Sequence, residues 1–184
     1  EVDVVVCPAF TALSDVSKLI LGSNIRLGAQ NLSDSGYGAF TGEIAPGMLR
    51  ELSVRYVILG HSERRQFQKE SDALVAKKAA NAHANNLIPI VCVGETLAER
   101  EANITEKVVE TQVRGSLAGL TAEQVERAAD ASSALASASS LISRSGTSRE
   151  SWRNSVPIDA SCARASLNRS SWLRTPSGGV GAVL

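Results

Sequence analysis

The residues best suited to chemistry are a histidine, His61, and the two polar residues that follow it, Ser62 and Glu63. Imidazole is the side chain that most readily changes its protonation state near neutral pH, and it serves as a general acid, a general base or a neutral hydrogen-bond donor. His61 directly follows the apolar run Tyr56-Val57-Ile58-Leu59 and Gly60. A lone histidine after a strand is weak evidence of catalysis, and a hydrogen-bonded structural histidine is the alternative.

The elements on either side of His61 determine where it lies. The run 56–59 is apolar and half β-branched, which predicts a strand buried on both faces of a parallel sheet. After Gly60 the pattern changes to a helical rhythm, so His61 falls on the turn between a strand end and a helix start. Unpaired backbone N–H groups gather at such a turn, and they favour anions and disfavour an imidazolium.

The same order of strand, turn and helix recurs along the first 120 residues. Strands are predicted at 2–6, 25–30, 56–59 and 87–93. Helices are predicted at 13–21, 48–54, 74–86 and 97–120, with His83 on the solvent side of the third. Thr96 with Glu99 forms a capping box, and Thr121 with Gln124 starts a further helix. Repeated βα units require parallel strands joined by right-handed crossovers, so the fold class is α/β with about four βα units.

A glycine-rich loop from Asn31 to Glu43 separates the second predicted strand from the next helix. A solvated loop tip is the plainer interpretation of such a stretch. The loop nevertheless carries Tyr37 and Phe40, and aromatic side chains on a protruding loop commonly belong in a partner's pocket. It is therefore a candidate contact for a protein partner.

Several separated motifs closely resemble those of the triosephosphate isomerase family, in the same order and spacing. They extend from residue 2 to about residue 124. The matching blocks are Val4-Val5-Val6-Cys7-Pro8, Gly28-Ala29-Gln30-Asn31, Gly38-Ala39-Phe40-Thr41-Gly42-Glu43, Tyr56-Val57-Ile58-Leu59-Gly60-His61-Ser62-Glu63-Arg64-Arg65, Pro89-Ile90-Val91-Cys92-Val93-Gly94-Glu95-Thr96 and Glu99-Arg100-Glu101. The resemblance implies a partial TIM (β/α)8 barrel and an isomerase that interconverts dihydroxyacetone phosphate and glyceraldehyde 3-phosphate in glycolysis and gluconeogenesis.

The resemblance also implies roles for individual residues. His61 is the electrophile that polarises the substrate, and Glu63 is a carboxylate that organises the network around it. Glu95 and Arg64 brace the loops, and the other supporting residues are Ser62 and Cys92. Two plainer alternatives stay open: Glu63 as a helix N-terminal charge favoured by the macrodipole, and Cys92 as an ordinary core residue.

The resemblance implies partners as well. Intact members of the family pair with a second copy of themselves through the loop residues Phe40, Thr41, Gly42 and Glu43, and Glu43 reaches the position of Arg64 across the interface. The substrate is a small phosphorylated triose. No metal, organic cofactor, nucleic acid or membrane partner is implied.

Length and composition indicate a soluble cytoplasmic chain that lacks part of such a barrel. The sequence has 184 residues, whereas a complete barrel takes about 250. Acidic and basic residues balance at 19 each. Cys7, Cys92 and Cys162 are far apart and lack metal-ligand spacing, which fits a reducing compartment. No apolar run reaches the length of a membrane span, and the first residues do not form a basic signal region.

The chain divides at Asp130 into residues 1–130, which match the barrel, and residues 131–184, which do not. Fifteen of the last 54 residues are Ser, six are Arg and none is Lys. Neither strand nor helix periodicity is sustained there, which predicts little stable packing, with both edges of the partial sheet left open. One hypothesis is a message read in the wrong frame, because back-translated pieces of this tail can be shifted to spell sequences resembling the family's seventh and eighth units.

These departures lead us to expect that the chain is a nearly inactive fragment. No Glu-Pro pair, where the family carries its catalytic base, follows Asp130, and the family's first strand with its Asn and Lys does not precede Val2. One alternative is a non-catalytic protein derived from the enzyme that acts through the Phe40 loop. Another is a different phosphate-binding barrel enzyme.

Overall fold

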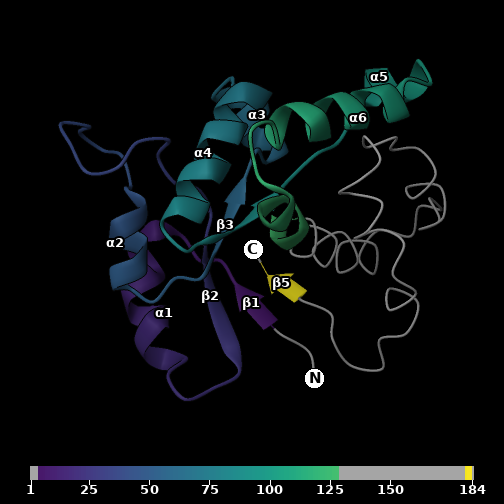
Figure 1. Ribbon diagram of the computed structural model, residues 1–184. Coiled ribbons are helices and arrows are strands. Elements are labelled where there is room, and N and C mark those ends of the chain that lie inside the picture. Colours follow the sequence, from purple (N-terminus) through teal and green to yellow (C-terminus); the bar gives the residue numbers. More distant parts are fainter. Residues whose placement is uncertain (1–3, 129–180, 184) are drawn as a thin grey trace.

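The computed structural model describes residues 4–128 and 181–183, in which strands and helices alternate (Figure 1). The strands are β1 (Val4–Val6), β2 (Ile25–Ala29), β3 (Tyr56–Leu59), β4 (Ile88–Val91) and β5 (Gly181–Val183). The helices are the 3-10 turn η1 (Phe10–Ala12), α1 (Leu13–Leu19), α2 (Pro46–Glu51), α3 (Ser62–Phe67), α4 (Asp72–Ala84), α5 (Leu97–Glu101) and α6 (Thr105–Ser116). A further helix covers 122–128. The predicted series of four βα units is confirmed.

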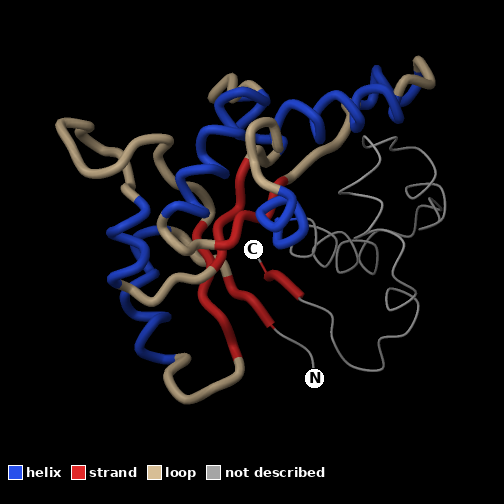
Figure 2. The backbone as a smooth tube through the Cα atoms, in the orientation of Figure 1, coloured by secondary structure: helices blue, strands red, loops and turns tan. Residues whose placement is uncertain are grey.

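The strands form one parallel sheet in the order β4-β3-β2-β1-β5 (Figure 2). In the pair at the β4 edge of the sheet, Tyr56 of β3 lies opposite Ile88 of β4, and Leu59 lies opposite Val91. Parallel strands end at the same edge of a sheet, so the segments that follow β3 and β4 are neighbours. A hydrogen bond of 2.8 Å from the Cys92 N–H to the Leu59 carbonyl continues the ladder to that edge.

Strand β3 is buried on both faces, as its unbroken apolar run predicts. Successive side chains of a strand point to opposite faces. Val57 and Leu59 belong to the larger core cluster, which also contains helical residues such as Val75 of α4. Tyr56 and Ile58 belong to a smaller cluster on the other face, made of strand residues and their immediate neighbours. The helices therefore cover one face of the sheet, and β3 lies between β4 and β2 with both of its faces buried.

Capping residues set the starts of the later helices as predicted. The Thr96 side chain accepts a hydrogen bond from the Glu99 N–H, and the Glu99 carboxylate accepts one of 2.7 Å from the Thr96 N–H. Thr121 and Gln124 exchange the same pair of bonds at the start of helix 122–128. The helix predicted at 48–54 is shifted, because Pro46 fits its first turn and Ser53, at a φ of 60°, cannot continue it.

The expectation that His83 lies on the solvent side of its helix is wrong. His83 is in the last turn of α4 and is only 8% exposed. Gln124 and Arg127 lie close enough to act on its imidazole, so helix 122–128 covers this side of α4. The sequence pattern of α4 alone could not reveal that cover, because it comes from a helix about 40 residues further along.

The edges of the sheet differ from the expectation of two open ends. At residues 181–183, β5 pairs in parallel with β1, with Val4 opposite Gly181 and Val6 opposite Val183. The β1 edge is therefore covered, whereas β4 has a strand neighbour on one side only among the described residues. The remaining expectations for the tail, including its packing and its reading frame, concern residues outside those described.

Candidate active site

His61 lies at the carboxyl end of β3, where the strand passes into α3. Gly60 makes the turn with a φ of +67°, a conformation that glycine adopts without strain. His61 is the N-cap of α3. Its position at the carboxyl edge of a parallel sheet is where βα proteins place their catalytic residues. The predicted strand end, turn and helix start are confirmed.

One long hydrogen bond from the backbone restrains the imidazole of His61. Its Nδ1 accepts a hydrogen bond from the Glu63 backbone N–H at 3.4 Å. A backbone N–H can only donate, so Nδ1 carries the lone pair, and the proton of the neutral ring is on Nε2. The side chain is 32% exposed, so the ring is partly accessible from solvent. A neutral imidazole with its Nε2–H available can donate a hydrogen bond to a substrate oxygen.

The two polar neighbours of His61 are more exposed. The Glu63 carboxylate lies 3.7 Å from the His61 Nδ1, and its side chain is 75% exposed, so solvent screens its charge. Ser62 is exposed on the first turn of α3. Glu63 therefore orients the imidazole through its backbone N–H more firmly than through its carboxylate.

Cys92 follows β4 at the same edge of the sheet. It is half-buried and packs against the smaller core cluster. Burial raises the pKa of the Cys92 thiol to about 11, although the nearby Arg65 charge acts in the other direction. The thiol is therefore protonated near neutral pH and does not act as a base. These contacts favour a packing role for Cys92.

Glu95 also follows β4, but its partner differs from the one expected. Its carboxylate accepts a hydrogen bond of 2.7 Å from Arg100 on α5. A hydrogen bond from its own backbone N–H, together with Arg100, keeps the pKa of Glu95 below its usual value. Arg64 instead donates to Glu70 at 2.7 Å. The ion pair between Glu95 and Arg100 therefore connects the segment after β4 to α5. Among the described residues, Arg64 is not a hydrogen-bond partner of Glu95.

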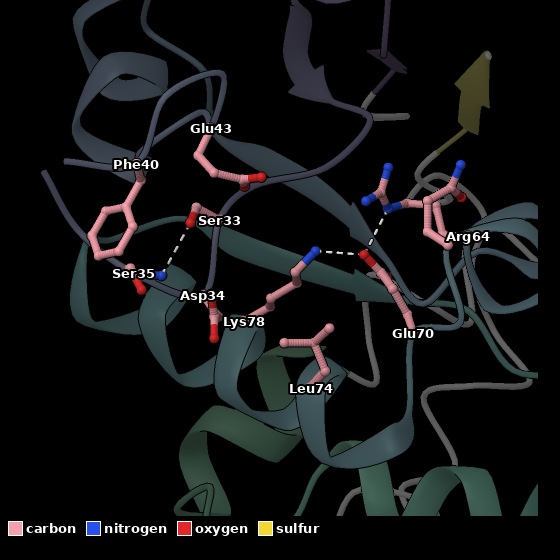
Figure 3. Close-up of a pocket in the computed structure, with 10 residues that line it drawn as sticks. Ser33, Asp34, Ser35, Phe40, Glu43, Arg64, Glu70, Leu74 and Lys78 are labelled. Atoms are coloured by element: carbon pink, nitrogen blue, oxygen red, sulfur yellow. Dashed lines mark hydrogen bonds and ion pairs between the residues drawn. The ribbon is translucent and has the colours of Figure 1, made fainter. Parts of the chain in front are cut away.

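The loop of residues 31–43 and helices α3 and α4 enclose a hollow of about 330 Å³, here called the loop hollow (Figure 3). Its lining includes Phe40, Glu43, Arg64, Glu70 and Lys78. Two of the predicted interface residues of the loop, Phe40 and Glu43, thus lie around one space with Arg64 in a single chain. Phe40 is 50% exposed, and Thr41, Gly42 and Glu43 are exposed as well.

One buried carboxylate, that of Glu70, pairs with two cationic side chains that line the loop hollow. Its side chain is 2% exposed and accepts hydrogen bonds from Lys78 at 2.5 Å and Arg64 at 2.7 Å. Burial alone raises the pKa of Glu70, but the bonds from Lys78 and Arg64 outweigh it and hold the pKa below its usual value. Lys78 also donates to Asn31 at 2.9 Å. Glu70 and Lys78 were not among the predicted site residues, and no short motif marks them.

The described residues contain neither a metal-binding cluster nor a membrane-spanning helix. Within 4–128 and 181–183, no three His, Cys, Asp or Glu side chains lie close enough together to hold a metal ion. No helix in the same part of the chain is long and apolar enough to cross a bilayer.

The parallel sheet, the helices on one face and a histidine at the carboxyl edge are the arrangement of part of a βα barrel. The family model for triosephosphate isomerase matches residues 1–131. The chain belongs to the triosephosphate isomerase family, and its described fold is part of a TIM barrel.

Individual relatives agree with this assignment. The triosephosphate isomerase of Clostridium botulinum (strain ATCC 19397 / Type A) is 58% identical over 125 residues, which cover 68% of this chain and 50% of that protein. The triosephosphate isomerase of Herpetosiphon aurantiacus is 58% identical over 123 residues, or 67% of this chain and 49% of that protein. The crystal structure of triosephosphate isomerase from Bartonella henselae matches with a TM-score of 0.62 and 44% identity, over 65% of this chain and 51% of that one. The chain thus spans about half the length of the curated relatives it matches.

Proposed function

We propose that this chain carries the electrophilic half of a triosephosphate isomerase site, which interconverts dihydroxyacetone phosphate and glyceraldehyde 3-phosphate. The observation that supports it most is the orientation of His61: the Glu63 N–H donates to Nδ1, so a neutral ring has its proton on Nε2. The family assignment supports the substrate class, because its members are isomerases of a triose phosphate.

The chemistry requires two kinds of group. A base removes a proton from carbon, and an electrophile stabilises the oxygen of the enediolate that forms. Triosephosphate isomerase is itself the standard example of a neutral histidine in the second role, so this role for His61 comes from the family and not from the geometry alone. His61 donates from Nε2 to the substrate oxygen, and Glu63 keeps the ring in place.

The general base of the reaction does not come from the usual family motif in this sequence. Residues 131–184 contain no Glu-Pro pair, the motif at which the family carries its base. Cys92 does not substitute for it, because its thiol has a pKa of about 11. Loss of a general base costs about 10²- to 10⁴-fold in rate. We therefore expect the 184-residue chain by itself to have no measurable isomerase activity.

The proposed setting is that of a cytoplasmic enzyme of glycolysis and gluconeogenesis that works as a homodimer without a metal or organic cofactor. Phe40, Thr41, Gly42 and Glu43 form the proposed dimer contact, and Glu43 reaches Arg64 of the partner subunit. The exposure of Phe40 and of these neighbours supports that contact, because half of an aromatic side chain is left open to solvent.

The test is to complete the barrel. Residues 4–128 replace the matching segment of the Clostridium botulinum relative, and the completed barrel and the 184-residue chain are assayed with glyceraldehyde 3-phosphate and with other sugar phosphates. The expected result is turnover of the triose phosphate by the completed barrel and none by the 184-residue chain. An inactive, folded completed barrel contradicts the proposal and favours the non-catalytic alternative, and turnover of a different sugar phosphate favours another barrel enzyme.

A further inference from the structure

Arg65, which follows directly after Arg64 on α3, makes a different set of contacts. Its Nε donates to the Gly60 carbonyl at 2.7 Å. Its Nη1 donates to the Asp72 carboxylate at 2.5 Å. Its Nη2 donates to the Cys92 carbonyl at 3.2 Å and to the Ser116 hydroxyl at 3.1 Å. All three nitrogens of the guanidinium are thus engaged. We call Gly60, Arg65, Asp72, Cys92 and Ser116 the sheet-end cluster.

The sheet-end cluster joins α3, which carries Arg65, to four other elements at one edge of the sheet. Gly60 and Cys92 follow β3 and β4, whereas Asp72 begins α4 and Ser116 ends α6. The Arg65 side chain is 16% exposed, and Ser116 is fully buried. Ser116 also donates to the Asp72 carboxylate at 3.2 Å, which closes the network. Charge-assisted bonds with little access to water are stronger than exposed ones, so this guanidinium is a rigid junction.

The bond to the Gly60 carbonyl has a direct consequence for His61. That carbonyl belongs to the same planar peptide unit as the His61 N–H, so fixing its oxygen fixes the backbone from which the imidazole projects. The turn and the guanidinium also fit closely, because a Cβ added to Gly60 would lie 2.9 Å from the Arg65 Nη2 and 3.3 Å from the Cys92 carbonyl. The turn and the guanidinium therefore pack against each other and leave no space for a side chain at residue 60.

We propose that Arg65 is a positioning residue for the isomerase reaction, acting through the Gly60–His61 peptide on the orientation of the His61 imidazole. The inference rests on the proposed function, since it assigns Arg65 to the same site. Arg65 acts through the backbone and is not a catalytic residue. The fork of the guanidinium is essential, because one ammonium cannot bind the Gly60 carbonyl, Asp72 and Cys92 together in the same geometry.

The experiment measures the tautomer of His61 in the complete 184-residue chain. The sequence contains two histidines, so ¹⁵N-labelled imidazoles give few signals, which are assigned with a His83→Gln variant. Spectra are recorded at pH 8, where an ordinary imidazole is neutral. The wild-type chain should hold His61 as one tautomer, protonated on Nε2. Arg65→Lys should shift the His61 nitrogens toward a mixture of both neutral tautomers, because the turn that presents Nδ1 to the Glu63 N–H is loosened.

Arg55→Lys is the matched control. Arg55 directly precedes β3, at the end of the strand opposite to Gly60, and its side chain is exposed. It should leave the His61 signals unchanged, and the His83 signals report in every variant whether α4 is still folded. Wild-type His61 signals in a folded Arg65→Lys chain overturn the proposal. If that variant does not fold, Asp72→Asn replaces it, because it weakens the anchor of the guanidinium without touching the turn, and an unchanged His61 tautomer there overturns the proposal equally.

Kinetics of the completed barrel separate this inference from the proposed function. With an active completed barrel, Arg65→Lys should lower kcat by roughly 10- to 100-fold and leave KM within about twofold, since misplacement of a catalytic group by about 1 Å has effects of that size. An inactive completed barrel refutes the proposed function, whereas the tautomer measurement in the 184-residue chain still decides whether Arg65 orients His61. Equal kcat values for wild type and Arg65→Lys contradict the positioning role.

Discussion

Two adjacent arginines on α3 belong to two regions that are built differently. Arg64 points into the loop hollow, where it shares the buried Glu70 carboxylate with Lys78. Arg65 points into the sheet-end cluster, where two of its partners are backbone carbonyls. In the loop hollow, charged side chains form ion pairs with one another. In the sheet-end cluster, the Arg65 side chain forms hydrogen bonds with backbone carbonyls. We therefore expect changes in the first region to act on stability, and changes in the second to act on the geometry of His61 as well.

The largest expected effect on stability is in the loop hollow. Glu70→Ala leaves the Lys78 ammonium, which is 6% exposed, without its carboxylate. Removal of one partner of a buried ion pair costs about 3–5 kcal/mol. Urea unfolding of the 184-residue chain measures this loss. Glu110→Ala is the control, because Glu110 pairs with Arg114 one turn away on α6 with both side chains partly exposed, and such pairs contribute about 0.3–0.5 kcal/mol. Equal losses in the two variants contradict the account of the loop hollow.

The same carboxylate makes a pH-dependent contribution. The folded pKa of Glu70 is below the ordinary value of 4.5. Its contribution to stability is therefore complete above pH 4.5 and is lost as the pH falls through the lower folded pKa. Urea unfolding at several pH values between 7 and 3 should show a steeper acid loss in the wild-type chain than in Glu70→Gln. Parallel curves for the two chains contradict this assignment.

Gly60→Ala tests the sheet-end cluster. Gly60 has a φ of +67°, and an added Cβ meets Arg65, Val75 and Cys92 at 2.9 to 3.3 Å. Backbone strain and crowding together should cost about 2–3 kcal/mol. Gly22→Ala provides the comparison, since Gly22 has a φ of +79° but nothing within 4 Å of the added atom, so strain alone should cost about 1 kcal/mol. The account fails if urea unfolding gives the larger loss for Gly22→Ala.

The smallest effect tests a purely local feature beside these two regions. Thr96→Ala removes the side chain that accepts from the Glu99 N–H at the start of α5. Loss of such a cap typically costs about 1 kcal/mol. Thermal or urea unfolding measures it, and Thr96→Ser, which keeps the hydroxyl, should recover most of the loss. A Ser variant as unstable as the Ala variant contradicts the capping role.

The two regions also explain which features could be predicted from the sequence. The apolar run of β3, the turn at Gly60 and the cap at Thr96 each depend on residues within about four positions of one another. Their local sequence patterns were therefore sufficient to predict them. The sheet-end cluster links Arg65 to Ser116, which is 51 residues away, and the loop hollow links Lys78 to Asn31, 47 residues away. Such contacts depend on how the helices pack on the sheet. The cover over His83 was missed for the same reason.

The most direct test of the central claim is the kcat of the completed barrel with and without His61. The account predicts that His61→Gln lowers kcat by about 10²- to 10⁴-fold, whereas His83→Gln, a change of the other histidine, leaves kcat near that of the unmodified completed barrel. A folded His61→Gln variant whose kcat is within about threefold of the unmodified barrel would contradict the role of His61 as the electrophile.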